Sequence, residues 1–249
     1  MSTYETTFDA SLVPAAAIDS RPQPALPLAA IEQYRALARR LDVERRGGGP
    51  RAMVVTSPTT AEGRTTTALY TAIALAGRGH RVVLADFDLR RPALAARHDL
   101  PETPGIVEVV RGEASLDQAL KLAPGAPGLT LLPAGTAQVD PAGILFDPRA
   151  KTLIEALTGA FDFVLADAPP ALGVADAACL ADLLGAVLLV ARAGHTSRRE
   201  LAAAAAALRD VKIIGCVLTG VETFASLEAK RAEQVAARKP MITALATRG

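Results

Sequence analysis

Beyond residue 50, short apolar runs alternate with segments of helical periodicity along most of the chain. Strands are predicted at residues 52–56, 81–86, 129–132, 163–167, 186–191 and 213–218. Helices are predicted at residues 65–76, 151–157, 177–183, 197–209 and 227–238. Nearly continuous apolar strands separated by helices are typical of a mostly parallel sheet that helices cover on both faces. The pattern therefore predicts an α/β sandwich of three layers.

The first 50 residues follow a different pattern. Residues 1–27 are rich in Pro, Ala, Ser and Thr without a sustained period, which predicts a mobile arm. Ile31, Tyr34, Leu37 and Leu41 then recur at helical spacing, until Arg45 and three glycines interrupt the pattern. We predict a helix and a Gly-rich hinge over residues 28–50, followed by the main domain over residues 51–249.

The composition excludes several functions. Half of the 249 residues are hydrophobic, enough to build a large core, and 27 basic residues nearly balance 26 acidic ones. With this balance, no Trp and 4% aromatic residues, neither charge attraction nor base stacking favours a nucleic acid partner. The longest apolar run, residues 183–191, is far shorter than the roughly 20 residues that a membrane span needs. We therefore expect a cytoplasmic protein without a direct membrane span, which only a partner would hold at a membrane.

The first predicted strand leads into its helix through a candidate phosphate-binding loop. Such loops read G-x-x-x-x-G-K-[ST]: backbone N–H groups hold the phosphates, the Lys contacts their oxygens and the hydroxyl holds Mg²⁺. Here Gly63 and Thr65 keep their places, and Arg64 stands where the Lys belongs. The candidate nucleotide-binding residues are Thr60, Ala61, Glu62, Gly63, Arg64, Thr65 and Thr66.

Acidic residues end two other predicted strands. Asp86 and Asp88 lie at the end of the second strand, and Asp167 ends the fourth. An aspartate at a strand end often caps the following helix, and this alternative holds for each one alone. Three of them beside a Gly-containing loop favour a nucleotide site in which Thr65, Asp86, Asp88 and Asp167 hold Mg²⁺. The predicted fold class is therefore an α/β sandwich of the P-loop NTPase type, with a mostly parallel central sheet.

Over residues 28–221 the chain resembles the cytoplasmic kinase domain of the bacterial tyrosine kinases (BY-kinases). The family's phosphate loop aligns with residues 57–66, its D-x-D-x-R-R-P segment with residues 86–92 and its D-x-P-P segment with residues 167–170. The resemblance implies ATP or ADP and Mg²⁺ as cofactors, and Asp86 as the candidate catalytic base. It also implies a membrane polysaccharide co-polymerase as the partner, at the cytoplasmic face of the inner membrane.

The phosphate loop departs from the family pattern at two positions. Arg64 replaces the Lys, and a planar guanidinium is not equivalent to a compact ammonium. Ala61 replaces a Gly where the backbone must wrap closely around phosphate. The family's C-terminal tyrosine cluster is also absent, because the three tyrosines are Tyr4, Tyr34 and Tyr70. We therefore expect nucleotide binding to be weakened or lost and kinase activity to be impaired.

The family's oligomerisation motif, E-x-x-R-x-x-R, is only partly kept. Glu32 and Arg35 match it, whereas Ala38 takes its last position, with Arg39 beside it. These residues are the candidate oligomer or partner contacts, and a monomer, a dimer and a partner-driven assembly stay open. Near the expected nucleotide base, Thr219 takes the place of a frequent Asn.

The leading hypothesis is an accessory, regulatory P-loop protein of exopolysaccharide, capsule or holdfast-like polysaccharide biosynthesis and export, which acts with a membrane co-polymerase. One alternative is an active tyrosine kinase or ATPase of the same pathway, in which Arg64 takes over from the Lys. The other is a scaffold that binds no nucleotide. Phosphate on Tyr4 or Tyr34 after incubation with ATP and Mg²⁺ would favour the first alternative, and absence of nucleotide binding the second.

Overall fold

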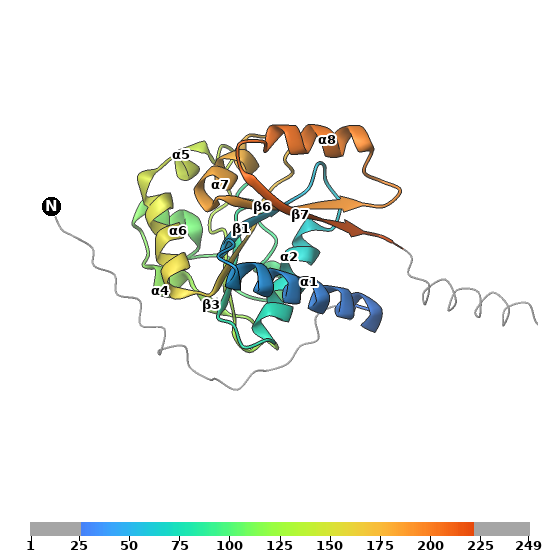
Figure 1. Cartoon of the computed structure of the whole chain (residues 1–249). Coiled ribbons are helices and arrows are strands. Elements are labelled where there is room, and N and C mark those ends of the chain that lie inside the picture. Colours follow the sequence, from blue (N-terminus) through green and yellow to red (C-terminus); the bar gives the residue numbers. More distant parts are fainter. Residues whose placement is uncertain (1–25, 222–249) are drawn as a thin grey trace, which may run out of the picture.

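A seven-stranded sheet forms the centre of the computed structural model, which describes residues 26–221 (Figure 1). The strand order is β3–β4–β2–β5–β1–β6–β7; β3 runs antiparallel to β4, and all other neighbours are parallel. The strands are β1 (Ala52–Thr56), β2 (Val82–Asp86), β3 (Lys121–Leu122), β4 (Leu129–Leu132), β5 (Phe163–Asp167), β6 (Ala186–Arg192) and β7 (Lys212–Thr219). Six of them confirm the predicted strands to within one residue at each end, and β3 has no counterpart in the prediction. The predicted arm, apart from residues 26 and 27, and the predicted helix at 227–238 lie outside the described residues.

Helices cover both faces of the sheet. Successive side chains of a strand point to opposite faces, so Ala52 and Val54 of β1 join one core cluster and Met53 and Val55 the other. One face is covered by α1 (Leu28–Arg46) and α2 (Arg64–Ala76). The other is covered by α3 (Ile106–Arg111), α4 (Leu116–Ala119), α5 (Ala142–Leu145), α6 (Pro148–Ala160), α7 (Asp176–Leu184) and α8 (Arg198–Ala207). The three layers confirm the predicted fold class.

Helix α1 is tied to the rest of the domain through a buried carboxylate. Asp42 is 1% exposed and accepts hydrogen bonds from Arg46 and Arg78, both at 2.7 Å. His80 Nε2 lies 3.0 Å from the same carboxylate. The hydrogen bond from Arg78 is the main reason why the pKa of Asp42 is lowered to about 2. The helix continues to Arg46, so the break predicted at residue 45 is wrong by two residues and the chain turns at Gly47.

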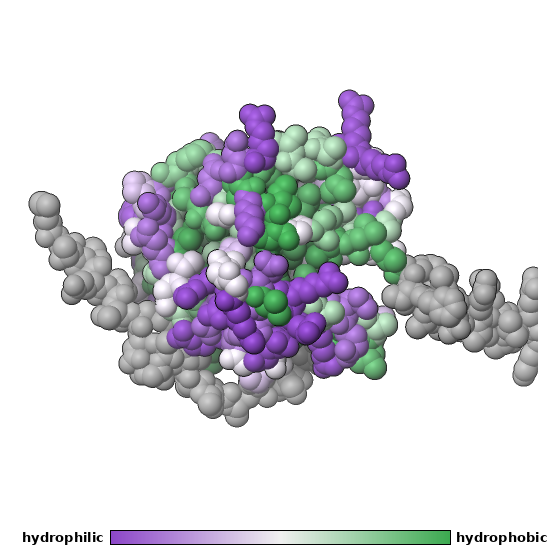
Figure 2. All heavy atoms as spheres, viewed as in Figure 1, coloured by the Kyte–Doolittle hydropathy of each residue, from purple (hydrophilic) through white to green (hydrophobic). Residues whose placement is uncertain are grey.

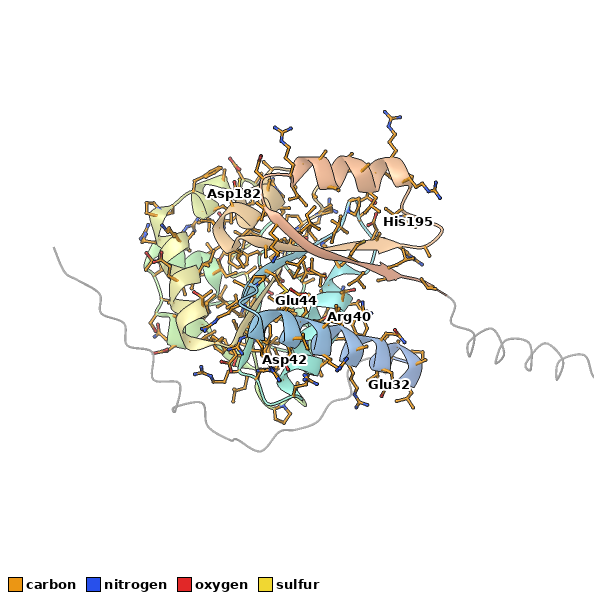
Figure 3. All side chains as sticks on the ribbon, in the orientation of Figure 1. Glu32, Arg40, Asp42, Glu44, Asp182 and His195 are labelled. Carbon is orange, nitrogen blue, oxygen red and sulfur yellow. The ribbon has the colours of Figure 1, made fainter. Side chains whose placement is uncertain are left out.

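The outer side of α1 carries the predicted contact motif. Glu32 and Arg35 form an exposed ion pair at 2.5 Å, and Arg39 is exposed as well. Figure 3 shows Glu32 near the start of this helix and Arg40 further along it. Ala38 lies on the inner side of α1 and is fully buried in the core cluster that α1 and α2 form with the sheet. The charged side chain that the motif has at this position would enter that cluster, where charged residues are rarely found.

The sheet ends in a partly exposed edge strand, β7. Ile213 is 36% exposed and Leu218 57% exposed. Figure 2 shows hydrophobic residues gathered over the part of this face where β6, β7 and α8 lie, next to the hydrophilic surface of α1. Between residues 26 and 221, no helix combines the length and the apolar character that crossing a bilayer requires.

Candidate nucleotide-binding site

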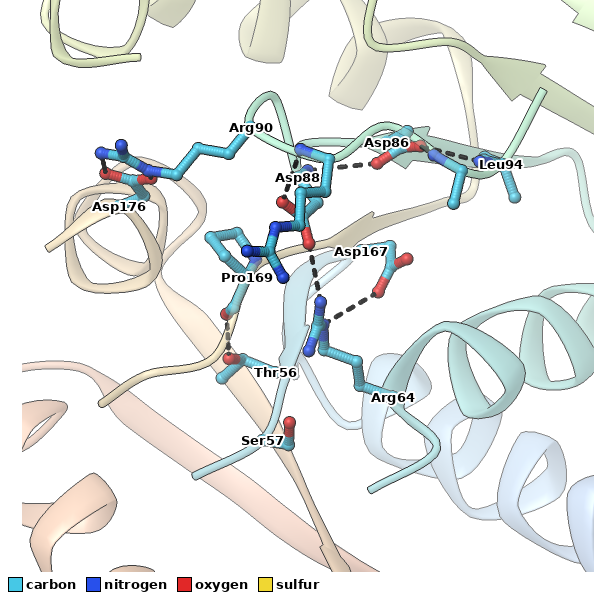
Figure 4. A network of polar contacts seen from close by, with 12 residues as sticks. Thr56, Ser57, Arg64, Asp86, Asp88, Arg90, Leu94, Asp167, Pro169 and Asp176 are labelled. Carbon is cyan, nitrogen blue, oxygen red and sulfur yellow. Dashed lines mark hydrogen bonds and ion pairs between the residues drawn. The ribbon is translucent and has the colours of Figure 1, made fainter. Parts of the chain in front are cut away.

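The predicted loops meet at one edge of the sheet. β1 lies between β5 and β6, and β2 lies on the other side of β5. The strand registers place Asp167 beside both Val55 and Asp86. Because these strands are parallel, their carboxyl ends bring the loop after β1 close to the acids that follow β2 and β5 (Figure 4). Ligands of open α/β sheets bind at this edge.

The loop after β1 presents the N-terminus of a helix. α2 begins at Arg64, directly after Gly63, whose φ of 89° lies in the left-handed region. A Cβ at Gly63 would lie 3.5 Å from Thr219, so the backbone conformation, and not the space, demands glycine. The first N–H groups of a helix have no intrahelical partners, and the helix dipole is positive at this end. The backbone of residues 63–66 therefore suits an anion such as phosphate.

Ala61 adopts the same rare conformation without being a glycine. Its φ is 61°, which costs a non-glycine residue roughly 1–2 kcal/mol. Distant residues hold the loop in place: Arg192 Nη1 donates to the carbonyl of Ala61 at 3.1 Å, and Thr219 Oγ1 donates to that of Glu62 at 2.7 Å. The buried Glu62 carboxylate also accepts a hydrogen bond from the Thr59 hydroxyl at 2.6 Å. The sequence analysis did not single out Arg192. This residue ends β6, at the same edge of the sheet as the loops after β1, β2 and β5.

Arg64 turns its guanidinium toward the acidic side of the site (Figure 4). Nη2 donates to Asp88 Oδ2 at 2.7 Å, and Nε lies 3.9 Å from Asp167 Oδ1. The three side chains are mostly buried, with 14%, 11% and 3% of their surfaces exposed. Arg64 Nε and Asp167 Oδ1 are buried without a hydrogen-bond partner within residues 26–221. The arginine at the lysine position therefore compensates the charge of the acids at the strand ends.

Asp86 is held by backbone groups of the loop after β2. Its Oδ1 accepts the N–H of Asp88 at 3.1 Å, and its Oδ2 accepts those of Ala93 and Leu94, both at 2.9 Å. Three of the four lone-pair positions of the carboxylate are thus used. Burial raises the pKa of Asp86, which is 1% exposed. In this arrangement Asp86 shapes the loop, and its role as a catalytic base stays a prediction.

Asp167 is the most strongly perturbed acid of the site. Burial and the neighbouring carboxylate of Asp86 raise its pKa to about 7, although a hydrogen bond with Thr65 and the charge of Arg64 oppose this effect. Thr65, Asp88 and Asp167 therefore lie together around Arg64, whereas the carboxylate of Asp86 faces the backbone. In the part of the chain that the structure describes, no three Asp, Glu, His or Cys side chains are grouped to hold a metal ion.

Two cavities open at this edge of the sheet. The larger, of 480 Å³, lies beside the acids, and the smaller, of 310 Å³, lies over residues 61–66. Arg97 lines both, and Arg91 lines the larger one. Neither forms an ion pair with another described residue. Arg90, in contrast, is bound to both carboxylate oxygens of Asp176 at 2.7 and 3.2 Å. Two guanidinium groups are therefore available to an anion in these cavities.

The layers, the strand order and the loop from β1 into α2 define a fold of the P-loop NTPase class. No protein-family model matches the chain. The chain is 31% identical to the tyrosine-protein kinase YwqD of Bacillus subtilis over 191 residues. The matched region covers 76% of this chain and 80% of YwqD. It is also 32% identical to the putative tyrosine-protein kinase EpsB of Ralstonia solanacearum over 171 residues. This match covers 69% of this chain but 23% of the longer EpsB. The chain belongs to the bacterial tyrosine kinase family, as the resemblance predicted.

Solved structures agree with this assignment. The kinase domain of the Escherichia coli tyrosine kinase ETK superposes with a TM-score of 0.76 at 27% identity, over 83% of this chain and 82% of that domain. The fold is also shared with cobyrinic acid a,c-diamide synthase of Mycobacterium smegmatis, solved with bound ADP and magnesium. That match has a TM-score of 0.60 at 23% identity and covers 79% of this chain and 85% of the synthase chain, so it concerns the fold alone.

Proposed function

We propose that this chain is an accessory P-loop protein of exopolysaccharide, capsule or holdfast-like polysaccharide biosynthesis and export, with a nucleotide site of impaired kinase activity. Membership of the bacterial tyrosine kinase family supports the pathway and the nucleotide. The observation that carries the impairment is the ion pair between Arg64 and Asp88 at 2.7 Å.

The backbone of residues 60–66 binds the phosphates of ATP or ADP in this proposal. The N-terminus of α2 supplies the N–H groups, and Gly63 and Ala61 give the loop its curvature. In a loop with lysine, a flexible ammonium follows the oxygens of the transferred group. Here the cation is bound to Asp88, and loss of one positioned donor lowers the rate of a transfer reaction on the order of 10²–10³-fold.

The Mg²⁺ that the family resemblance implies does not fit the residues as they are arranged. Mg²⁺ needs oxygen ligands in near-octahedral geometry at about 2.0–2.1 Å. Thr65, Asp88 and Asp167 offer donors of the right kind, but the guanidinium of Arg64 contacts Asp88 and faces Asp167. Asp86 is directed toward backbone N–H groups. No step of the proposed function is therefore assigned to the ion.

The partner in this proposal is a membrane polysaccharide co-polymerase, which would hold the chain at the cytoplasmic face of the inner membrane. The proposed contact is the outer side of α1, where Glu32, Arg35 and Arg39 are exposed. Exposed charges of both signs on one helix suit a polar contact with another protein. Self-association through the same surface would compete with this contact.

The test is a comparison of the full chain with Arg64→Lys. Each is incubated with ATP and Mg²⁺, and phosphotyrosine at Tyr4, Tyr34 and Tyr70 is followed by mass spectrometry. We expect the natural chain to be slower by about 100-fold or more. If the natural chain became fully phosphorylated at the same rate as Arg64→Lys, it would be an active kinase, and the proposed impairment would be wrong. Nucleotide binding itself is measured by calorimetric titration with ATP and ADP, and Asp88→Ala is the control. If the natural chain bound neither nucleotide, the scaffold alternative would be favoured.

A further inference from the structure

We propose that the guanidinium of Arg64 takes the place of the divalent cation, so that this site binds nucleotide phosphates without Mg²⁺. The inference rests on the proposed function, in which residues 60–66 bind a nucleotide. It starts from the position of the guanidinium, which contacts Asp88 at 2.7 Å and lies 3.9 Å from Asp167. An ion shared by these two acids would have to lie in the same space (Figure 4).

The carboxylate oxygens that a cation would need are mostly engaged. Both oxygens of Asp86 accept backbone N–H groups. Asp88 Oδ1 accepts the N–H of Arg91 at 3.3 Å, and Asp88 Oδ2 accepts Arg64 Nη2. Asp167 Oδ1 is unpartnered within residues 26–221, but it faces Arg64 Nε. A divalent ion bound to both Asp88 and Asp167 would therefore have to displace the guanidinium of Arg64.

Arg64 is built into this position. It is the first residue of α2, and 14% of its side chain is exposed, so the guanidinium lies within the site and not in solvent. A guanidinium is a cation with five N–H donors and no acceptor. A divalent cation that entered beside it would meet a fixed like charge at close range, which disfavours its binding. A lysine at this position has a compact ammonium on a flexible stem and can withdraw from the acids.

The same residues offer the nucleotide a replacement for the charge of the ion. Arg64 lines both cavities at this edge of the sheet, so its guanidinium can donate to a phosphate oxygen there. Arg97 lines both cavities and Arg91 lines the larger one, and neither forms an ion pair with another described residue. Together with the N-terminus of α2, three guanidinium groups surround the space for the phosphates.

Calorimetric titration of the full chain with ADP, in EDTA and in excess Mg²⁺, tests the inference. For the natural chain we expect the two dissociation constants to agree within about threefold, because no ion is needed. For Arg64→Lys we expect ADP to bind about tenfold or more tightly with Mg²⁺ than with EDTA. Arg149→Lys, at an exposed ion pair outside the site, serves as the matched control and should behave as the natural chain does. A gain of about tenfold with Mg²⁺ in the natural chain would overturn the inference.

A second measurement separates this inference from the proposed function. Binding of Mn²⁺ alone is followed by electron paramagnetic resonance in the natural chain, in Arg64→Ala and in Arg64→Ala with Asp88→Asn. We expect Arg64→Ala to bind Mn²⁺ about tenfold more tightly than the natural chain, and the double variant to lose this gain. Equal Mn²⁺ binding by all three proteins would overturn the inference. Absence of ADP binding by every variant would overturn the proposed function and, with it, nucleotide binding at this site. The Mn²⁺ result would still decide whether Arg64 takes the place of a divalent ion.

Discussion

Replacement of Asp167 by Asn removes an ionisable group from the lining of the candidate nucleotide-binding site. Asp167 is 2% exposed, and burial together with Asp86 raises its pKa from 3.8 to about 7. A raised pKa means that the folded chain holds the proton more tightly than the unfolded chain does. The stabilisation by the protonated group is therefore complete below pH 4 and is lost as the pH rises through 7.

The size of the effect follows from the two pKa values. A rise from 3.8 to about 7 means that ionised Asp167 costs the folded state about 4 kcal/mol at pH 8. About 2 kcal/mol of this cost is already present at pH 5, because the unfolded carboxyl ionises near pH 4. The stability of Asp167→Asn relative to the natural chain should therefore increase by about 2 kcal/mol between pH 5 and pH 8.

The assay is urea denaturation without nucleotide and in EDTA, at pH values from 5 to 8. Asp210→Asn is the matched control for the substitution itself, because the Asp210 side chain is 83% exposed and does not line the cavities of the site. If the difference between Asp167→Asn and the natural chain did not change with pH, Asp167 would ionise in the folded protein as it does in water. The argument from burial would then fail.

Three further substitutions test features of the fold. Ala61→Gly should raise the unfolding free energy by about 1 kcal/mol in urea titrations, because φ is 61° there; a decrease would show that Ala61 is not strained. Gly105→Ala should cost about 3 kcal/mol and lower Tm, because the new Cβ would lie 2.3 Å from the backbone nitrogen of Gly135; an unchanged Tm would contradict this. Asp42→Ala should cost about 2 kcal/mol in urea titrations, since it leaves Arg78 without its buried carboxylate; a cost near zero would mean that the cluster does not hold α1.

The sheet was predictable because its strands carry an unambiguous signal. All five residues of β5 are buried, as they are in β1 and β2, and each strand appears in the sequence as four apolar residues followed by a polar one. β3 has two residues, one of them Lys121, and neither length nor pattern distinguishes it from a loop. α4 and α5 have four residues each, too few for a helical period to show.

The location of the site was predictable, but the directions of its side chains were not. The strand ends brought Asp86, Asp88 and Asp167 to the sheet edge beside the loop, as the parallel topology requires. Whether a carboxylate faces a ligand or the backbone depends on local turns, and the N–H groups of residues 93 and 94 draw Asp86 away. The contact of Arg64 with Asp88 depends on a side-chain rotamer, which no sequence pattern reports.

The hydrogen bonds from Arg192 and Thr219 that hold the loop after β1 have a consequence for synthesis on the ribosome. The loop leaves the ribosome early, but β1 pairs with β5 and β6, and the groups that hold its turn come from Arg192 and Thr219. A growing chain therefore carries the loop through most of translation without the strands and hydrogen bonds that shape it. We expect a chain that ends before β7 to lack the hydrogen bond from Thr219 and to leave this loop without its native shape.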